Sequence, residues 1–295
     1  MKILVCSDGS ERSRRAVSFA AIIATSTKAE TTVFGIAQNQ KEEERLRAIL
    51  SQESRALATG GMRLEIATKS GDPVPESVQW TRDRAYDLVA IGAERRGAQE
   101  FFLPSAKAYS ITEAISPPAL VVPCERNQIK RILICSGGGP YIDNAVRFTA
   151  RIAKDLSAEI TLLSVLPQAP AMHGTLYRRQ KDVEALLNSN SALACNLRNE
   201  RKIIEDAGVR ATIRIGHGIV LDQILNEVAK GDHDLVVAGS WPVRDRWRSY
   251  AIGNITRDII NRTDRPVLVI RSDKAPKSLA IRLRKIVPRF GPKSN

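Results

Sequence analysis

An internal repeat is the feature that most constrains the fold, because three blocks of the sequence recur once, in the same order. The blocks, each followed by its second occurrence, are "KILVCSDGSERSRRAVSFAAIIA" at 2–24 and "RILICSGGGPYIDNAVRFTARIA" at 131–153, "YDLVAIGA" at 86–93 and "HDLVVAGS" at 233–240, and "PALVVP" at 118–123 and "PVLVIR" at 266–271. Three matched blocks in one order indicate two copies of one structural unit.

Each copy alternates short apolar runs with helical patterns. The runs are continuous rather than alternating, which is typical of strands buried on both faces of a parallel sheet. Between them, Ala16, Phe19, Ala20 and Ile23 share one face of a predicted helix. The predicted strands are Lys2–Ser7, Thr31–Ala37, Arg63–Thr68, Leu88–Gly92, Leu120–Val122, Arg131–Ser136, Glu159–Leu166, Arg210–Ile215, Leu235–Gly239 and Val267–Ile270. The sequence therefore predicts an α/β protein with two tandem doubly wound domains, with ligands expected at the edge where the strands end.

Domain boundaries follow from the repeat and from the short polar segment "PCERNQ" at 123–128, whose composition is that of a linker. We predict a first domain over 1–124, a linker over 125–128, a second domain over 129–272 and a C-terminal tail over 273–295. A chain of 295 residues is long enough for two such domains.

The tail carries much of the formal net charge of +13, because residues 271–295 hold eight Lys or Arg and one Asp. Leu279, Leu283, Ile286 and Phe290 recur there at helical spacing. Two interpretations are open. The tail is solvated or packs as a helix on its own protein, or it contacts a protein partner, nucleic acid or an anionic membrane surface.

Features of export, metal binding and catalysis are absent from the sequence. No apolar run approaches the ~20 residues that span a bilayer, and the start "MKILVCSDGS" lacks an apolar signal segment, so we expect a cytoplasmic protein. The four cysteines have no metal-ligand spacing, and the three histidines are isolated. The chain contains no Walker-type loop, GxSxG elbow or HExxH motif, so we expect neither a metal site nor an enzyme.

The motifs reached so far carry a family resemblance. The opening "ILVCSDGSERS", the strand endings "DLVAIGA" and "DLVVAGS", the passage "GNITRDIINRTDRPVLVI" and the "SGDP" at 70–73 together resemble the universal stress protein family, in two copies up to about residue 272. The resemblance implies an adenine nucleotide alpha hydrolase-like fold, a five-stranded parallel sheet flanked by helices in each copy. It also implies pairing across edge strands, either between the two copies of this chain or in a homo-oligomer, and a role in the stress response.

Many members of that family bind ATP through an Asp at the end of the first strand and a G-x2-G-x9-G-[ST] loop after the fourth. In the first copy this comparison gives Asp8, Val33, Gly92 and Ser105 as candidate nucleotide contacts, with Arg95 at the second glycine position. Asp8 has an alternative interpretation as a helix N-cap. The third glycine and the hydroxyl of the family pattern are also replaced in this copy, by Ser105 and Ala106.

In the second copy the candidates are Gly138, Gly239, Gly253 and Asn254, but Gly137 stands at the position of the Asp. Pro242 stands at the second glycine, and the interval from Gly239 to Gly253 is one residue longer than the family pattern. Between these glycines lie three arginines, Arg244, Arg246 and Arg248, and two tryptophans, Trp241 and Trp247. These side chains either bind a phosphate or base, or fasten the loop to the neighbouring copy.

Two functions therefore remain. One is a stress-response or regulatory protein that binds ATP or another adenine nucleotide at one site. The other is a dimerisation or docking module without nucleotide, in which the basic tail faces an unknown protein partner.

Overall fold

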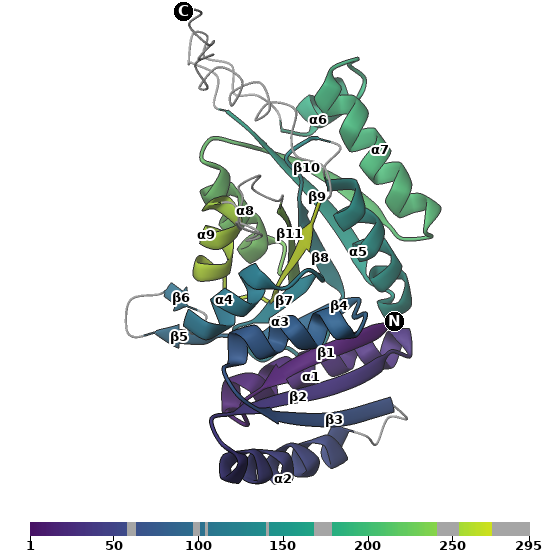
Figure 1. Cartoon of the computed structure of the whole chain (residues 1–295). Coiled ribbons are helices and arrows are strands. Elements are labelled where there is room, and N and C mark those ends of the chain that lie inside the picture. Colours follow the sequence, from purple (N-terminus) through teal and green to yellow (C-terminus); the bar gives the residue numbers. More distant parts are fainter. Residues whose placement is uncertain are drawn as a thin grey trace, which may run out of the picture.

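The first half of the chain alternates strands and helices. The computed structural model describes residues 1–57, 63–96, 101–103, 106–139, 142–167, 179–240 and 254–272 (Figure 1). The elements of the first half are β1 (Lys2–Ser7), α1 (Glu11–Thr27), β2 (Glu30–Ala37), α2 (Gln40–Leu57), β3 (Arg63–Ser70), α3 (Pro73–Asp83), β4 (Leu88–Gly92), β5 (Glu94–Arg96), β6 (Phe101–Leu103), α4 (Ala106–Ala114) and β7 (Ala119–Val122).

The second half repeats this order. Its elements are β8 (Arg131–Cys135), α5 (Asp143–Leu156), β9 (Glu159–Leu166), α6 (Arg179–Leu187), α7 (Ala192–Asp206), β10 (Ala211–His217), α8 (Val220–Lys230), β11 (Leu235–Ser240), α9 (Asn254–Arg262) and β12 (Val267–Arg271). All ten predicted strands form, and their bounds differ from the predicted ones by at most two residues.

The described strands other than β5 and β6 form one ten-stranded sheet in the order β10-β9-β8-β11-β12-β7-β4-β1-β2-β3. Neighbours are parallel within each half, and β12 pairs with β7 antiparallel. The predicted α/β fold class is confirmed. Where the sequence predicts two five-stranded sheets, the structure joins them into one through their fifth strands.

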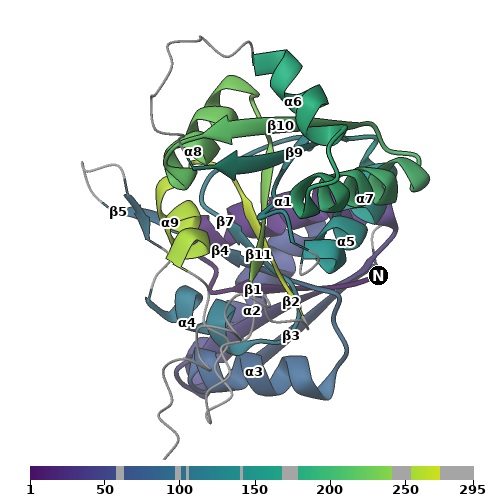
Figure 2. The same ribbon diagram turned by 90° about the horizontal axis from the view of Figure 1, so that it is seen from above.

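Pairing of β7 with β12 places Leu120 opposite Leu268, and both side chains are buried. Helices α1, α2, α5 and α7 cover one face of the sheet, and their apolar side chains belong to one core cluster that extends through both halves (Figure 2). Helices α3 and α4 of the first half and α8 and α9 of the second cover the other face with separate clusters. The two copies of the repeat therefore share a core within a single chain.

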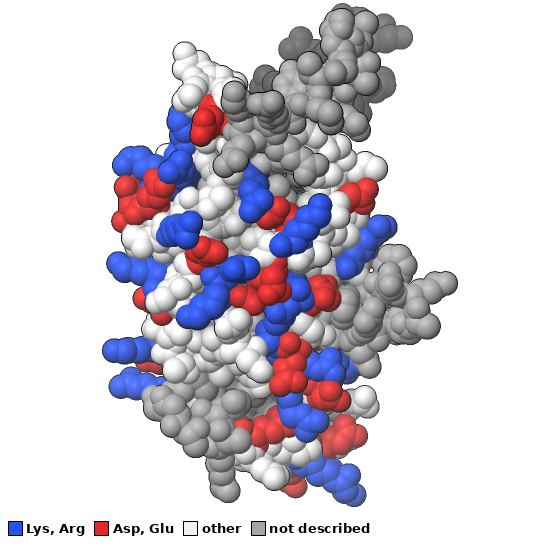
Figure 3. Space-filling view, turned by 180° about the vertical axis from the view of Figure 1, so that it is seen from behind, with Lys and Arg blue, Asp and Glu red and all other residues white. Residues whose placement is uncertain are grey.

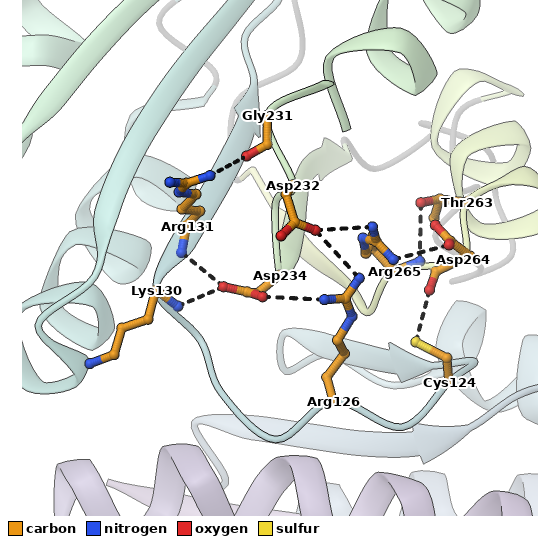
Figure 4. Close-up of polar contacts among 10 residues, drawn as sticks. All are labelled: Cys124, Arg126, Lys130, Arg131, Gly231, Asp232, Asp234, Thr263, Asp264 and Arg265. Atoms are coloured by element: carbon orange, nitrogen blue, oxygen red, sulfur yellow. Dashed lines mark hydrogen bonds and ion pairs between the residues drawn. The ribbon is translucent and has the colours of Figure 1, made fainter. Parts of the chain in front are cut away.

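The segment that the sequence predicts as a linker is held against the second half (Figure 4). The Arg126 guanidinium lies 3.6 Å from the carboxylate of Asp234 and 3.8 Å from that of Asp232. Asp234 is buried, and it also accepts hydrogen bonds from two backbone N–H groups at the start of β8. The Cys124 thiol donates to the backbone carbonyl oxygen of Asp264 at 2.8 Å. These contacts fix the passage from β7 to β8.

One short hairpin was not predicted. Strands β5 and β6 pair antiparallel as a separate two-stranded sheet, and β6 contacts α9 of the other half. Strands of three residues carry no usable periodicity, and the partner that supports this hairpin lies about 150 residues away in the sequence. The first copy's counterpart of the family loop therefore reaches across to the second copy.

Candidate functional site

A pocket lies where β1 and β4 run side by side and their chains turn away to opposite sides of the sheet. In doubly wound sheets this switch point, at the carboxyl ends of the strands, is where ligands bind. The pocket has a volume of about 110 Å³, close to the ~150 Å³ cavity that holds a benzene ring. Its lining residues are Cys6, Ser7, Asp8, Arg12, Ser13, Phe34, Ile36, Pro73, Ser77, Ile91, Gly92 and Ile111.

Asp8 follows β1 directly, and its side chain is half-exposed in the pocket. One carboxylate oxygen accepts hydrogen bonds from the Ser10 amide and hydroxyl groups, and the other lies 2.7 Å from the Arg12 guanidinium. Partial burial acts to raise the pKa of Asp8, but the hydrogen bonds from Arg12 and Ser10 outweigh it and lower the pKa to about 2. Asp8 is therefore an ionised acceptor. The N-cap of α1 is Ser10, whose hydroxyl accepts from the Ser13 amide.

Gly92 ends β4 beneath the first turn of α1. A Cβ atom at this position would lie 2.3 Å from the carbonyl oxygen of Arg12 and 2.9 Å from the amide nitrogen of Ser13. The absence of a side chain therefore lets α1 approach β4 closely, which brings Asp8 and Arg12 to the pocket. Packing accounts for this glycine whether or not a phosphate binds there.

An aromatic stack supports the pocket wall on the α3 side. The rings of Phe34 and Trp80 are stacked with centroids 4.3 Å apart, and the guanidinium of Arg84 lies 3.6 Å from the centroid of Trp80. Of the two adjacent residues Val33 and Phe34 on β2, only Phe34 lines the pocket. The Val33 side chain is buried in the core on the opposite face. The structure thus does not bring the side chain of Val33 into the candidate site.

The last candidate of the first copy, Ser105, and the residue at the second glycine position, Arg95, follow β4 in the chain. Ser105 is outside the described residues. Arg95, at the second glycine position, belongs to β5. In that hairpin its backbone pairs with Phe102.

At the corresponding edge of the second half, Gly138 packs against a side chain of α7. Gly138 has a φ of +66°, and a Cβ atom there would lie 2.1 Å from the Leu193 side chain of α7. Its amide donates to the Ser136 hydroxyl at 3.1 Å, and its carbonyl oxygen accepts from the Asn196 side chain at 2.6 Å. The conformation and the contact with Leu193 both explain the glycine.

The remaining candidates of the second copy are only partly described. Gly239 lies on β11, and its carbonyl oxygen accepts from the Thr256 hydroxyl at 3.3 Å. Asn254 is the first residue of α9. Gly253 and the arginine- and tryptophan-rich loop at 241–253 lie outside the described residues.

Sequence reasoning missed a carboxylate on the second helical element of each half. Leu46, Leu50 and Glu53 of α2 repeat as Leu193, Leu197 and Glu200 of α7. The two leucines Leu46 and Leu193 contact the equivalent glycines Gly9 and Gly138, so the two triplets occupy matching places. This L-x3-L-x2-E pattern is the signal that would have found both glutamates.

The two glutamates have different environments. Glu53 lies 3.6 Å from Arg14, and burial together with the nearby charge of Asp8 raises its pKa. Glu200 is fully buried and accepts from the Ser136 hydroxyl at 3.0 Å. Burial raises the pKa of Glu200 to about 7, despite that hydrogen bond.

The described residues contain neither a metal-binding cluster nor a helix that could span a membrane. Those residues contain no group of three or more His, Cys, Asp or Glu side chains arranged to hold a metal ion. None of the helices among them is both long enough and apolar enough to cross a membrane.

Two doubly wound halves on one sheet, with a pocket at the switch point of the first, define a tandem-repeat α/β protein. A model of the universal stress protein family matches the chain twice, over residues 1–123 and 128–271. The chain therefore belongs to the universal stress protein family, as the sequence motifs predicted.

Known relatives resemble either one half of the chain or nearly all of it. Universal stress protein MJ0531 of Methanocaldococcus jannaschii is 24% identical over 148 residues, which cover 50% of this chain and 85% of that protein. The crystal structure of a universal stress protein from Archaeoglobus fulgidus DSM 4304 superposes with a TM-score of 0.70 at 16% identity, covering 92% of this chain and 98% of the other. A structure from Pseudomonas aeruginosa UCBPP-PA14 gives a TM-score of 0.65 at 17% identity, covering 97% and 96%. At this identity the structural likeness concerns the fold.

Proposed function

We propose that this universal stress protein is a regulatory protein of the stress response that binds an adenine nucleotide, ATP or a related molecule, at the first-half pocket, which is large enough to hold one part of such a ligand. The observation that carries the proposal is the meeting of Asp8 and Gly92 at the switch point, beside an open pocket. The Asp8 carboxylate offers an acceptor for nucleoside hydroxyl groups, and the N-terminus of α1 favours an anion.

Isothermal titration calorimetry of the whole protein with ATP, ADP, AMP and cyclic dinucleotides tests this function. We expect binding at submillimolar concentration to at least one of them. Asp8→Asn should weaken it by about tenfold or more, since a hydrogen bond to a charged group contributes about 1.5 to 3 kcal/mol. Glu205→Gln is the matched control, because Glu205 also pairs with an arginine four residues away at 2.7 Å, far from the pocket. Absence of heat with every ligand would overturn the proposal.

The proposal includes no catalysed reaction. Incubation of the protein with ATP should release neither ADP nor AMP above the level of a buffer control, and stoichiometric binding should leave the nucleotide intact. All four cysteines are free thiols, which is usual in reducing compartments and supports action in the cytosol.

A docking role without nucleotide is the second candidate. It is favoured by the contact of β6 with α9, which uses the first copy's counterpart of the family loop as an inter-half contact.

The described surface opposite that of Figure 1 mixes Lys and Arg with Asp and Glu, without a continuous basic area there (Figure 3). Affinity capture with the full chain and with a chain lacking residues 273–295 tests the tail. Loss of a salt-sensitive partner supports docking through the tail, and an unchanged set of partners opposes it.

A further inference from the structure

The first-half pocket contains an ion pair of its own. Asp8 follows β1, Arg12 lies in the first turn of α1, and both line the pocket. The guanidinium lies 2.7 Å from the carboxylate, and the two side chains are 32% and 46% exposed. Any ligand that enters this pocket therefore meets a negatively charged carboxylate and a positively charged guanidinium side by side.

The Asp8 carboxylate can accept only a limited number of further hydrogen bonds. An ionised carboxylate has about four acceptor positions. From the described residues Asp8 receives two hydrogen bonds from Ser10 and one from Arg12, which leaves about one position that none of those residues fills. Because the pKa of Asp8 is lowered to about 2, the carboxylate does not donate. A ligand group beside Asp8 has to bring its own donor, such as a hydroxyl, and a bare anion would be repelled there.

Arg12 supplies the opposite preference. Its guanidinium is planar and always charged, and it presents several N–H donors that match the oxygens of a phosphate. It is also carried on the first turn of α1, where the helix dipole favours an anion. The ion pair thus combines a site for a hydroxyl donor with a site for an anion a few ångströms away.

The two halves of the chain support a shared role for this pair. In the repeat alignment Asp8 corresponds to Gly137 and Arg12 to Tyr141. The serine that precedes Asp8 is retained as Ser136, and the glycine after it as Gly138. Asp8 and Arg12 are therefore both present in the first half and both replaced in the second, although the serine before and the glycine after the Asp8 position are kept.

We propose that Arg12 makes the first-half pocket selective for phosphorylated ligands. A ligand hydroxyl takes the remaining acceptor position of Asp8, and the guanidinium shares its donors between Asp8 and the ligand phosphate. This inference rests on the proposed nucleotide binding and adds a specificity-determining residue to it.

The test compares adenosine with AMP, which differ only in the phosphate, and adds inorganic phosphate as a ligand without the nucleoside. Affinities for adenosine, AMP and inorganic phosphate are measured by calorimetry on the full chain and on the variants Arg12→Gln and Arg12→Lys. We expect the wild type to bind AMP at least about tenfold more tightly than adenosine, and inorganic phosphate more weakly than AMP. Arg12→Gln should reduce the AMP-to-adenosine ratio by about tenfold and change adenosine affinity by no more than about threefold. Arg12→Lys should retain part of the preference for AMP over adenosine.

Arg201→Gln is the matched control. Arg201 pairs with Glu205 four residues away at the same 2.7 Å, on helix α7 of the other half. This variant should leave both affinities unchanged. Thermal unfolding checks that each variant folds. Because the Arg12 side chain is partly exposed, we expect its substitution to leave the fold intact.

Several outcomes would overturn the inference. An unchanged AMP-to-adenosine ratio in Arg12→Gln would remove Arg12 from ligand selection. Tighter binding of both ligands to this variant would show that the guanidinium competes with the ligand for Asp8. Equal affinity for inorganic phosphate and AMP would refute the role of the hydroxyl. A wild type that binds neither adenosine nor any nucleotide overturns the proposed function as well, whereas binding with an unaltered ratio overturns this inference alone.

Discussion

The Ser136 hydroxyl donates a hydrogen bond of 3.0 Å to one carboxylate oxygen of Glu200, and this links the end of β8 to helix α7 inside the second half. The other oxygen of Glu200 has no hydrogen-bond partner among the described residues. A buried carboxyl in this setting is more stable with its proton than without it, because an ionised group here would lack sufficient partners.

The first prediction concerns the pH dependence of stability. Since the pKa of Glu200 is raised from 4.5 to about 7, its contribution to folding is present below pH 4.5 and is lost as the pH rises to about 7. Glu200→Gln imitates the protonated form. Between pH 4 and pH 8 the wild type should therefore lose about 2 to 3 kcal/mol of unfolding free energy relative to Glu200→Gln. Urea denaturation at several pH values measures it.

Glu205→Gln on the same helix is the control for this measurement. Its side chain is 46% exposed. The unfolding free energy of Glu205→Gln relative to that of the wild type should therefore stay nearly constant between pH 4 and pH 8. Parallel pH profiles for the wild type and Glu200→Gln would contradict the prediction.

The second prediction concerns the charge of Asp8. Hydrogen bonds from Arg12 and Ser10 hold the pKa of Asp8 at about 2 against the effect of burial. In Arg12→Gln this pKa should rise toward the usual 3.8, whereas Arg201→Gln should leave it unchanged. Carboxyl carbon chemical shifts followed by NMR from pH 2 to pH 6 measure the pKa. An Asp8 that titrates at the same pH in both variants would show that Arg12 does not hold it ionised.

The third prediction compares two equivalent glycines. Gly92→Ala places a Cβ atom 2.3 Å from a backbone oxygen, and Gly239→Ala places one 3.2 Å from the end of the Ile142 side chain. Backbone atoms of α1 can move only with the helix, whereas the end of a side chain can rotate. Gly92→Ala should therefore cost about 3 kcal/mol of stability and Gly239→Ala about 1 kcal/mol or less. Chemical denaturation of both variants gives the comparison, and equal losses would refute it.

The fourth prediction concerns thiol reactivity. Burial raises the pKa of Cys6 and of Cys135 to about 12, and the thiolate is the reactive form. Cys195 is exposed on α7. Iodoacetamide at pH 8 should modify Cys195 first and reach Cys6 and Cys135 only in denaturant, as read by peptide mass spectrometry. Modification of Cys6 at the rate of Cys195 in the native protein would contradict this.

The sequence was most informative about the strands. Continuous apolar runs such as Leu88–Gly92 are buried on both faces of the sheet, so their composition alone identifies them. The repeat also indicated that both halves share one topology. Neither pattern specifies the antiparallel pairing of β7 with β12. The family resemblance implied pairing across edge strands and left open whether it joins the two copies or two chains, and the structure shows it between the two copies.

The candidate site was harder to predict. Asp8 and Gly92 were found from motif positions, and the pocket brings them together. Arg12 is one of several charged residues at the start of α1, and its contact with Asp8 depends on a rotamer that no sequence pattern specifies. Phe34 was missed in favour of its neighbour Val33, because adjacent residues on a strand face opposite sides of the sheet. Whether these residues bind a nucleotide stays a prediction.

The pairing of β7 with β12 within a single chain has an evolutionary consequence. In a symmetric dimer of identical subunits, every substitution appears twice, once on each side of the two-fold axis. Here the paired units belong to one gene product, so a substitution affects one unit only. Asp8 and Gly137 occupy equivalent turns yet differ in charge. The tandem chain can thus retain one pocket while its twin diverges, and a stoichiometry of one ligand per chain is the expected result of that freedom.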